Sequence, residues 1–476
     1  MGCSTWKHLT SLVAALALTA SLLGAQSATE AGAGKLVPAN PRATAITEYE
    51  AALDAWQGWS WTEGYQHARR ALGADSSFGL ARALHARYRG GPTVAAELSQ
   101  AASDAAKGPV PEAVLALAAR AGGANAAVLW NAAVQLFPND PRVALDRALA
   151  LAGEARLVAL REMTKKFPDH VASKYWLAYY LALPIQPRAP KAVLDEALAV
   201  AQEGVRQAPN AGASHTALAF VLERLEREDE ALEHLKAATS LPDPTNFPFE
   251  VRAEILVHKN RIAEARAALD SAILLTDNMG GHVTYQVTRA LTFLHKGNLA
   301  AAMASVEDAA KEAMVNEQRG AEAQAHVTMA MMLAAADNVP AVNEHLAIAR
   351  RLGATPATLN DAMVISYGLT KQGAAARKAL EAYIVTAQAQ APAVRELNVH
   401  RMTGMALLAE GKPAEAIAEF RQGGTNPYAQ VGIIEAYLQM GKKKEASAER
   451  AALFARTDFS VGSTALAGAR YRSLRK

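Results

Sequence analysis

The sequence predicts an all-α protein in which antiparallel helix pairs stack into an α-solenoid. Residues 400–453 hold two successive copies of one pattern, and fainter copies recur along most of the chain. In the better copy, His400, Gly404 and Leu407 share one helical face, and Ala416 and Phe420 lie on a second helix after a Gly-Lys-Pro break. One such pair cannot bury its apolar face alone, so neighbouring pairs must stack.

Composition and length predict the same fold class. Apolar residues make up 51% and aromatic residues only 6% of the 476 residues, and strong helix formers such as Ala, Leu, Glu, Arg and Lys are abundant. A chain of this length exceeds the size at which a single hydrophobic core keeps growing. Repetition therefore favours an elongated array over one large globular core.

Residues 1–25 are predicted to be a secretory signal peptide. Lys7 and His8 precede an uncharged apolar stretch over residues 9–23, and small residues stand at the expected cut before Gln26. This stretch is shorter than the roughly 20 residues that a membrane-spanning helix needs, which favours cleavage over a retained anchor. We expect export to the periplasmic or extracellular space, with no direct membrane insertion after cleavage. Residues 26–43, rich in Ala, Gly, Ser and Pro, are predicted to form a flexible leader.

From about residue 44 to residue 455 the pattern is similar to that of the tetratricopeptide repeat (TPR) family, whose unit is a helix pair of 34 residues. The copy at 400–424 and a copy at 212–243 match the family's small and large positions. The copy that follows residue 424 departs from them at Arg450, where the family prefers Phe. The resemblance implies ten to twelve helix pairs, with peptides or extended protein segments bound on the face lined by the first helices. The matching residues outside the best copy include Ala126, Trp130, His215, Leu218, Ala231, Leu235, Tyr437, Gly441 and Ala446.

Proline and glycine clusters indicate where the array is divided. Residues 184–190 and 242–248 each hold three prolines, and residues 278–281 read Asn-Met-Gly-Gly. We place a boundary at the latter, which separates an N-terminal TPR-like array over 44–278 from a C-terminal one over 279–457. Residues 458–476 are expected to be either a capping helix or a frayed tail.

Charge and cysteine content exclude several classes of function. Forty-nine Lys and Arg against 46 Asp and Glu give a formal charge of +3, and the basic run at 442–444 is followed at once by Glu445, so no nucleic-acid partner is expected. Cys3 is the sole cysteine and lies in the predicted signal peptide. The mature chain would therefore have no disulfide, thiolate metal site or cysteine nucleophile.

Motifs for catalysis or metal binding are scarce. The sequence contains no His-Glu-x-x-His and no Gly-x-Ser-x-Gly. His282 follows Gly280 and Gly281 in a predicted loop, where catalytic groups can lie, but has no recognisable acid or nucleophile partner. We predict no catalytic residue, no metal ligand set and no cofactor, and therefore no enzymatic activity.

Two aromatic clusters are the candidate partner-binding residues. Aromatic side chains contribute contact area at little entropic cost and are common in peptide-binding surfaces. The alternative is that both clusters form core between repeats. The first cluster holds Trp56, Trp59 and Trp61, and the second holds Tyr175, Trp176, Tyr179 and Tyr180.

These observations predict an exported TPR-like scaffold that binds a protein or peptide partner in an envelope assembly, with no chemistry of its own. One alternative is a structural accessory subunit of a membrane-associated complex. Another is a small-ligand binder or enzyme built into the groove, which a carboxylate beside His282 in a deep pocket would support.

Overall fold

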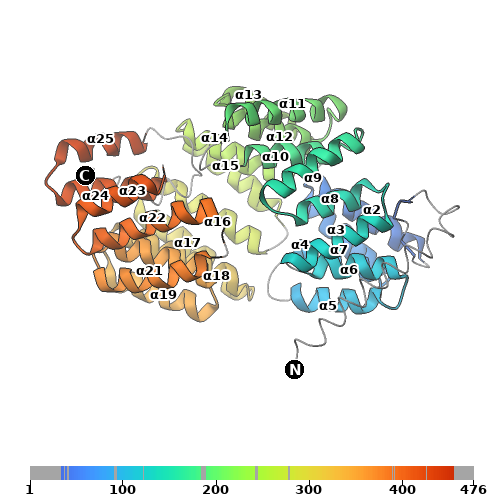
Figure 1. Cartoon of the computed structure of the whole chain (residues 1–476), viewed down its shortest axis with the longest axis horizontal. Helices are drawn as coiled ribbons and strands as arrows, with labels where there is room; N and C mark the ends of the chain where they lie inside the picture. The colour runs from blue at the N-terminus through green and yellow to red at the C-terminus, as the bar shows by residue number, and fades with distance from the viewer. Residues whose placement is uncertain are drawn as a thin grey trace. The chain divides into compact units, whose positions relative to one another are not determined.

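The computed structural model contains 24 α-helices and no strand in the part of the chain that it describes. The described residues are 34–36, 38–39, 42–89, 94–121, 123–183, 189–241, 245–276, 279–388, 390, 392–424 and 426–454. The predicted signal peptide and the tail at 458–476 lie outside them. The all-α fold is as the sequence predicts, and consecutive helices follow one another along the chain as labelled in Figure 1.

The helices form two compact units, and the division falls after Pro248, near the start of α14. In the first unit the helices are α2 (Ala43–Gln57), α3 (Trp61–Ala74), α4 (Gly79–Arg89), α5 (Val94–Ala105), α6 (Val110–Arg120), α7 (Gly123–Leu136), α8 (Pro141–Ala150), α9 (Gly153–Lys166), α10 (Val171–Ala182), α11 (Lys191–Gln207), α12 (Gly212–Arg224) and α13 (Glu228–Thr239).

Helix α14 (Phe247–His258) crosses the division, and the second unit continues from it. Its remaining helices are α15 (Ile262–Leu274), α16 (Met279–Leu294), α17 (Leu299–Val315), α18 (Arg319–Ala335), α19 (Val339–Leu352), α20 (Pro356–Leu369), α21 (Gly373–Ala387), α22 (Pro392–Ala409), α23 (Pro413–Gln422), α24 (Pro427–Gln439) and α25 (Lys443–Phe454). The two units divide about thirty residues before the boundary at 278 that the glycines indicated. The units are defined by the packing of their helices, which glycines that interrupt a helix do not determine.

Each unit is a row of antiparallel helix pairs, which is a TPR-like arrangement. Most even-numbered helices pack against the helix that follows, and first helices of successive pairs also pack together, as α18, α20, α22 and α24 do. Twelve pairs, α2–α3 through α24–α25, follow one another in the described residues, in agreement with the predicted ten to twelve.

The turn inside many pairs is a Schellman motif. In this motif a residue just beyond the end of the first helix has a left-handed backbone, and the N–H of the residue that follows it donates to a carbonyl five positions earlier. Gly411 has φ 75°, and Lys412 N–H donates to the Leu407 carbonyl at 3.0 Å. Lys371 has φ 57°, and Gln372 N–H donates to the Tyr367 carbonyl at 2.9 Å. The same pair of features occurs at Trp59, Glu226, Asn260, Gly297, Asp337 and Gly441.

Close helix crossings hold neighbouring pairs together. Phe420 of α23 is fully buried between α22 and α24. A Cβ at Gly404 would lie 2.7 Å from the Phe420 ring, and one at Gly432 would lie 2.1 Å from it. Because no larger residue fits at either glycine, this ring fixes how closely three successive helices approach.

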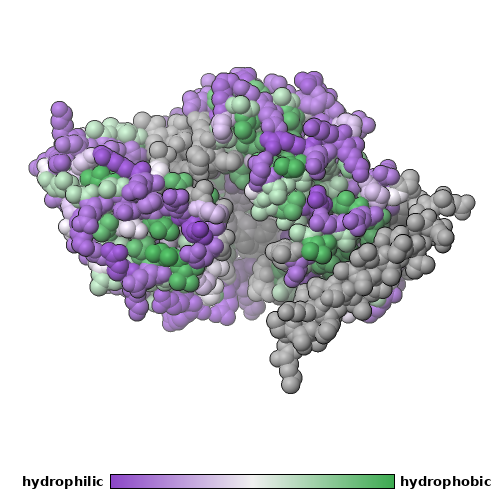
Figure 2. Space-filling model, viewed as in Figure 1, coloured by the Kyte–Doolittle hydropathy of each residue, from purple (hydrophilic) through white to green (hydrophobic). Residues whose placement is uncertain are grey.

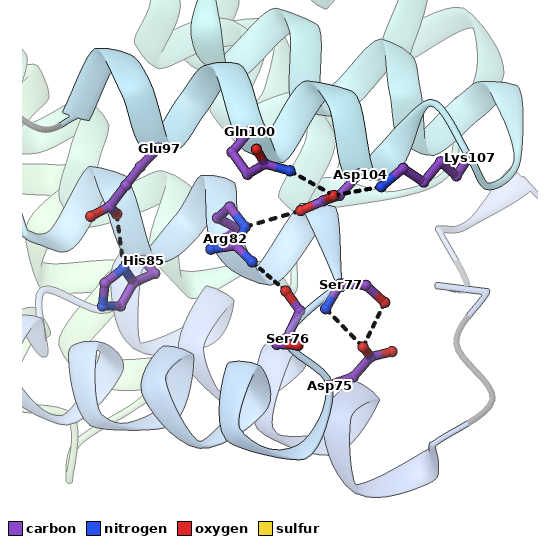
Figure 3. Close-up of polar contacts among 9 residues, drawn as sticks. All are labelled: Asp75, Ser76, Ser77, Arg82, His85, Glu97, Gln100, Asp104 and Lys107. Carbon is purple, nitrogen blue, oxygen red and sulfur yellow. Dashed lines mark hydrogen bonds and ion pairs between the residues drawn. The ribbon is translucent and has the colours of Figure 1, made fainter.

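Polar contacts hold the edge of the α4–α5 pair (Figure 3). The Asp104 carboxylate accepts hydrogen bonds from Arg82, Gln100 and Lys107 at 3.1, 2.9 and 3.1 Å. Burial alone would raise the pKa of Asp104, but these hydrogen bonds outweigh it and hold that pKa below its ordinary value. Asp104 therefore stays ionised and ties α5 to α4.

Hydrophilic residues cover most of the face seen in Figure 2, with hydrophobic patches between them. Within the described residues, no helix combines the length and the apolar character that crossing a bilayer requires.

The Schellman turns predict opposite effects of two matched substitutions. Lys371→Gly should stabilise the chain by about 1 kcal/mol, because glycine adopts the left-handed conformation without the Cβ penalty. Gly411→Ala, at the equivalent turn of the next pair, should destabilise it by about 1 kcal/mol, although a Cβ there would contact nothing within 4 Å. Urea unfolding followed by circular dichroism measures both, and effects of equal sign would contradict the interpretation.

Candidate partner-binding surfaces

The structure brings the two predicted aromatic clusters together around Trp59. This residue lies in the turn between α2 and α3, and its ring centroid is 5.4 Å from that of Tyr175 and 5.3 Å from that of Trp176, both on α10. Tyr179 lies at 5.7 Å and Phe247 at 5.3 Å. All four of these contacts are edge-on, which is a favourable geometry for aromatic rings.

Trp59 occupies a backbone position that normally suits glycine. Its φ is 62°, and Ser60 N–H donates to the Ala55 carbonyl at 2.9 Å, so Trp59 is the left-handed residue of the α2 Schellman turn. Only 2% of its surface is exposed. The ring contacts with α10 therefore outweigh the backbone cost, and they fix the end of α2 on α10.

Hydrogen bonds fix the same junction. Trp176 Nε1 donates to the Gln57 carbonyl at 3.0 Å, and Gln57 Nε2 donates to the Arg142 carbonyl at 2.9 Å. Gln57 is buried at the C-terminal end of α2, while Arg142 lies at the start of α8. The C-terminal end of α2 is thus joined to both α8 and α10.

The predicted site residues fall into an interior group and a half-buried rim. Trp59, Tyr175 and Trp176 are buried, and burial raises the pKa of the Tyr175 hydroxyl. The rim consists of Trp56, Trp61, Tyr179 and Tyr180. The Arg87 guanidinium lies 4.4 Å from the Trp56 ring centroid, and that of Arg156 lies 4.2 Å from the Tyr180 centroid. Sequence reasoning missed Gln57, which lies next to Trp56, and the more distant Phe220 and Phe247, all of which contact this cluster.

A second surface is occupied by the chain's own N-terminal segment. Leu36 N–H donates to Asp140 Oδ2 at 3.0 Å, and Asn139 N–H donates to the Gly34 carbonyl at 3.0 Å. Ala39 N–H donates to Glu112 Oε1 on α6. The sequence predicted a flexible leader over 26–43, whereas its described residues at 34–39 pack on the helices, because two carboxylates accept their main-chain N–H groups.

The Leu36 side chain is only 4% exposed. It belongs to a core cluster that includes side chains of α2, α4, α6, α7 and α8. A cavity adjoins it, lined mainly by apolar residues, with an Arg87–Asp146 ion pair at 3.0 Å on one wall. Its other lining residues include Tyr49, Leu53, Leu80, Leu84, Leu115, Trp130 and Val143.

Polar pairs recur at one register across the helix pairs. In each case a side chain on the first helix of a pair contacts the side chain nineteen positions later, on the second helix. The contact joins either a nitrogen and an oxygen atom or two nitrogen atoms. The ring nitrogens Nδ1 of His215 and His234 are 3.0 Å apart, and those of His326 and His345 are 2.8 Å apart. The other pairs at this offset are Glu48–His67, His400–Glu419 and Gln430–Glu449.

Within each histidine pair, the two Nδ1 atoms can form a hydrogen bond only when at least one of the two rings is neutral. His215 Nε2 lies 2.8 Å from the Pro209 carbonyl, which can only accept, so His215 Nδ1 of the neutral ring accepts from His234. Burial and the neighbouring His215 lower the pKa of His234, and burial and His345 likewise lower that of His326. Burial also lowers the pKa of His345, against the opposing effect of Glu344.

His282 lies on α16 rather than in a loop, and its Nδ1 is 3.0 Å from Glu312 Oε1 on α17. A carboxylate beside a histidine is common in this chain, as at His85–Glu97 and His400–Glu419. The pair therefore matches the general pattern of contacts between paired helices. Among the described residues, no group of three or more His, Cys, Asp or Glu is arranged to hold a metal ion.

Comparison with known proteins finds similar folds at low identity. No protein-family model and no curated protein matches the chain. A thermophilic TPR protein of Thermus thermophilus is 22% identical over 34% of this chain and 87% of that one, with a TM-score of 0.31. Human IFIT1, solved as a dimer with m7Gppp-AAAA, is 13% identical over 86% and 89%, with a TM-score of 0.43. Yeast Tom70 is 13% identical over 86% and 91%, with a TM-score of 0.40. Values this low transfer no ligand or partner to this chain.

The burial of the aromatic residues predicts different effects of substitution at the interior and the rim. Trp59→Ala should cost about 3–5 kcal/mol of unfolding free energy, as expected for a large side chain removed from a core. Trp59→Gly should cost about 1 kcal/mol less than Trp59→Ala, because glycine relieves the left-handed backbone. Tyr180→Ala should cost about 1 kcal/mol. Urea unfolding measures all three, and equal losses at positions 59 and 180 would rule out this division.

The histidine pairs predict a loss of stability on acidification. A histidine whose pKa is lowered by folding contributes stability above its unfolded value near 6.5, and this contribution falls as the pH drops below that value. The urea midpoint of the wild type should therefore decrease between pH 7.5 and pH 5.5. The variant His234→Gln/His345→Gln should show a smaller decrease, since one ring of each pair no longer takes up a proton.

Burial also lowers the pKa of His170, to about 4, so the informative quantity is the difference between wild type and variant. Equal decreases in both proteins would show that the two pairs contribute nothing to the acid response.

Proposed function

We propose that this chain is an exported, non-catalytic binding scaffold that holds an extended protein segment in an envelope assembly. The TPR-like fold is of a kind commonly used for protein interactions. Export is inferred from the apolar stretch at residues 9–23 and the small residues that follow it. The near balance of positive and negative charge supports a protein partner rather than a nucleic acid.

The observation that carries this proposal is the half-buried aromatic rim of Trp56, Trp61, Tyr179 and Tyr180. A second observation is that the described residues of the segment at 34–39 lie against first helices of the N-terminal unit. Its main-chain N–H groups bond to Asp140 and Glu112, and its Leu36 side chain is buried. Main-chain recognition with one apolar pocket is how grooves hold extended segments. The half-buried aromatic rim, on α2, α3 and α10, supplies further area of the kind that peptide-binding surfaces use.

Exposed apolar residues of the C-terminal unit favour the alternative of a structural accessory subunit. Leu274, Val315 and Val385 are 84%, 76% and 73% exposed, and each lies at or near the C-terminal end of the second helix of a pair. Such residues, repeated at one end of the pairs, suit a lateral contact with another subunit.

Photo-crosslinking in intact cells tests the two assignments. A photoreactive amino acid replaces Tyr180 on the aromatic rim, Val385 on the apolar edge, or Lys165, an exposed control residue on α9. A discrete adduct from position 180 alone supports the scaffold that binds at the rim. An adduct from position 385 alone supports the accessory subunit.

An adduct from neither position 180 nor position 385, or an equal yield from position 165, would overturn both assignments. The intact mass of the recovered chain tests export in the same sample. Loss of residues 1–25 is expected, and a chain that retains them would contradict signal cleavage.

A further inference from the structure

We infer that the surface holding residues 34–39 is a binding site for an extended segment of another protein, and that the chain's own segment occupies it until that partner displaces it. This inference rests on the proposed scaffold function. It assigns the partner a chemistry: an apolar side chain, one intervening residue and then a proline.

The main-chain contacts do not depend on the sequence of the bound segment. Leu36 N–H and Ala39 N–H donate to the carboxylates of Asp140 and Glu112, and the Gly34 carbonyl accepts from Asn139 N–H. Any segment that presents an N–H group at the first and fourth of four successive positions can make the same two donor contacts. The contacts therefore fix direction and register.

The side-chain contacts select the residues of the segment. Leu36 and Pro38 are buried, whereas Lys35 and Ala39 are exposed. The two buried positions, 36 and 38, are therefore the ones that face the helices. The cavity lined by Tyr49, Trp130 and other residues adjoins Leu36, which leaves room for a side chain larger than leucine.

The two carboxylates explain why the site is filled by the chain itself. Asp140 is 1% exposed and Glu112 is 6% exposed. Asp140 also caps α8, through the N–H groups of Arg142 and Val143. Asp140 keeps these two donors when the segment leaves, so the cost of a buried carboxylate that loses its donor falls on Glu112, whose pKa burial raises. Exchange of one donating segment for another avoids that cost.

Attachment gives the chain's own segment an advantage over a free competitor. Residue 39 is only a few residues from the start of α2 at Ala43, so the effective concentration of the tethered segment is on the order of millimolar. A partner must therefore bind more tightly than residues 34–39, or bind at a second surface at the same time.

The test uses the full mature chain and a fluorescent peptide with the sequence of residues 33–41, AGKLVPANP. Fluorescence anisotropy measures binding to the wild type, to Leu36→Glu, which releases the tethered segment, and to Leu36→Glu/Glu112→Ala. The peptide should bind Leu36→Glu at least tenfold more tightly than the wild type. Loss of Glu112 should weaken that binding roughly tenfold, since a hydrogen bond to a charged group is lost. A peptide with Glu in place of its Leu should not bind.

Absence of peptide binding to Leu36→Glu, in a chain whose circular dichroism matches the wild type, would overturn the inference. If Leu36→Glu loses helix, Leu36→Ala replaces it with the same expected order of affinities. Dimerisation of the wild type through exchanged segments would assign the occupant to a second copy and would also overturn it. The proposed scaffold function stands or falls separately, on the adduct from position 180.

Discussion

Close crossing of helices at small residues is the constraint on which the rest of this structure depends. Phe420 can lie between α22 and α24 only because Gly404 and Gly432 leave space for its ring. In the N-terminal unit a Cβ at Gly64 would overlap the Tyr88 hydroxyl, which itself donates to the Ala52 carbonyl. Such contacts set the distance between successive helices, and that distance sets which side chains reach across a pair. The recurrent polar contacts nineteen positions apart are a consequence of this fixed spacing.

In the N-terminal unit the same packing brings together parts of the chain that no single repeat contains. Helix α2 contacts α4 and α8, and its terminal turn carries Trp59 onto α10. Side chains of α2 and the buried Leu36 therefore pack on other first helices of this unit. The repeat pattern alone implies an open groove and does not include these contacts.

The sequence could predict what is local. The break at Gly411 and the small and large positions around Gly404 and Phe420 follow from helix periodicity and turn chemistry, and the structure confirms them. The meeting of Trp59 with Trp176 could not be predicted, because it spans more than one hundred residues and depends on how the intervening pairs stack. Composition made residues 34–39 look flexible, since a segment held through its main-chain N–H groups carries no periodic signal. The histidine pairs could have been found by aligning the repeats and comparing positions nineteen apart.

The histidine pair of α18–α19 shows how acid acts on this row of helices. Protonation of both His326 and His345 places two positive charges at a nitrogen separation of 2.8 Å, which opposes the contact. Burial and the neighbouring ring of His345 lower the pKa of His326, so the folded chain resists taking up the second proton. A fall in pH therefore acts on the individual helix pairs that carry two histidines rather than uniformly on the stack.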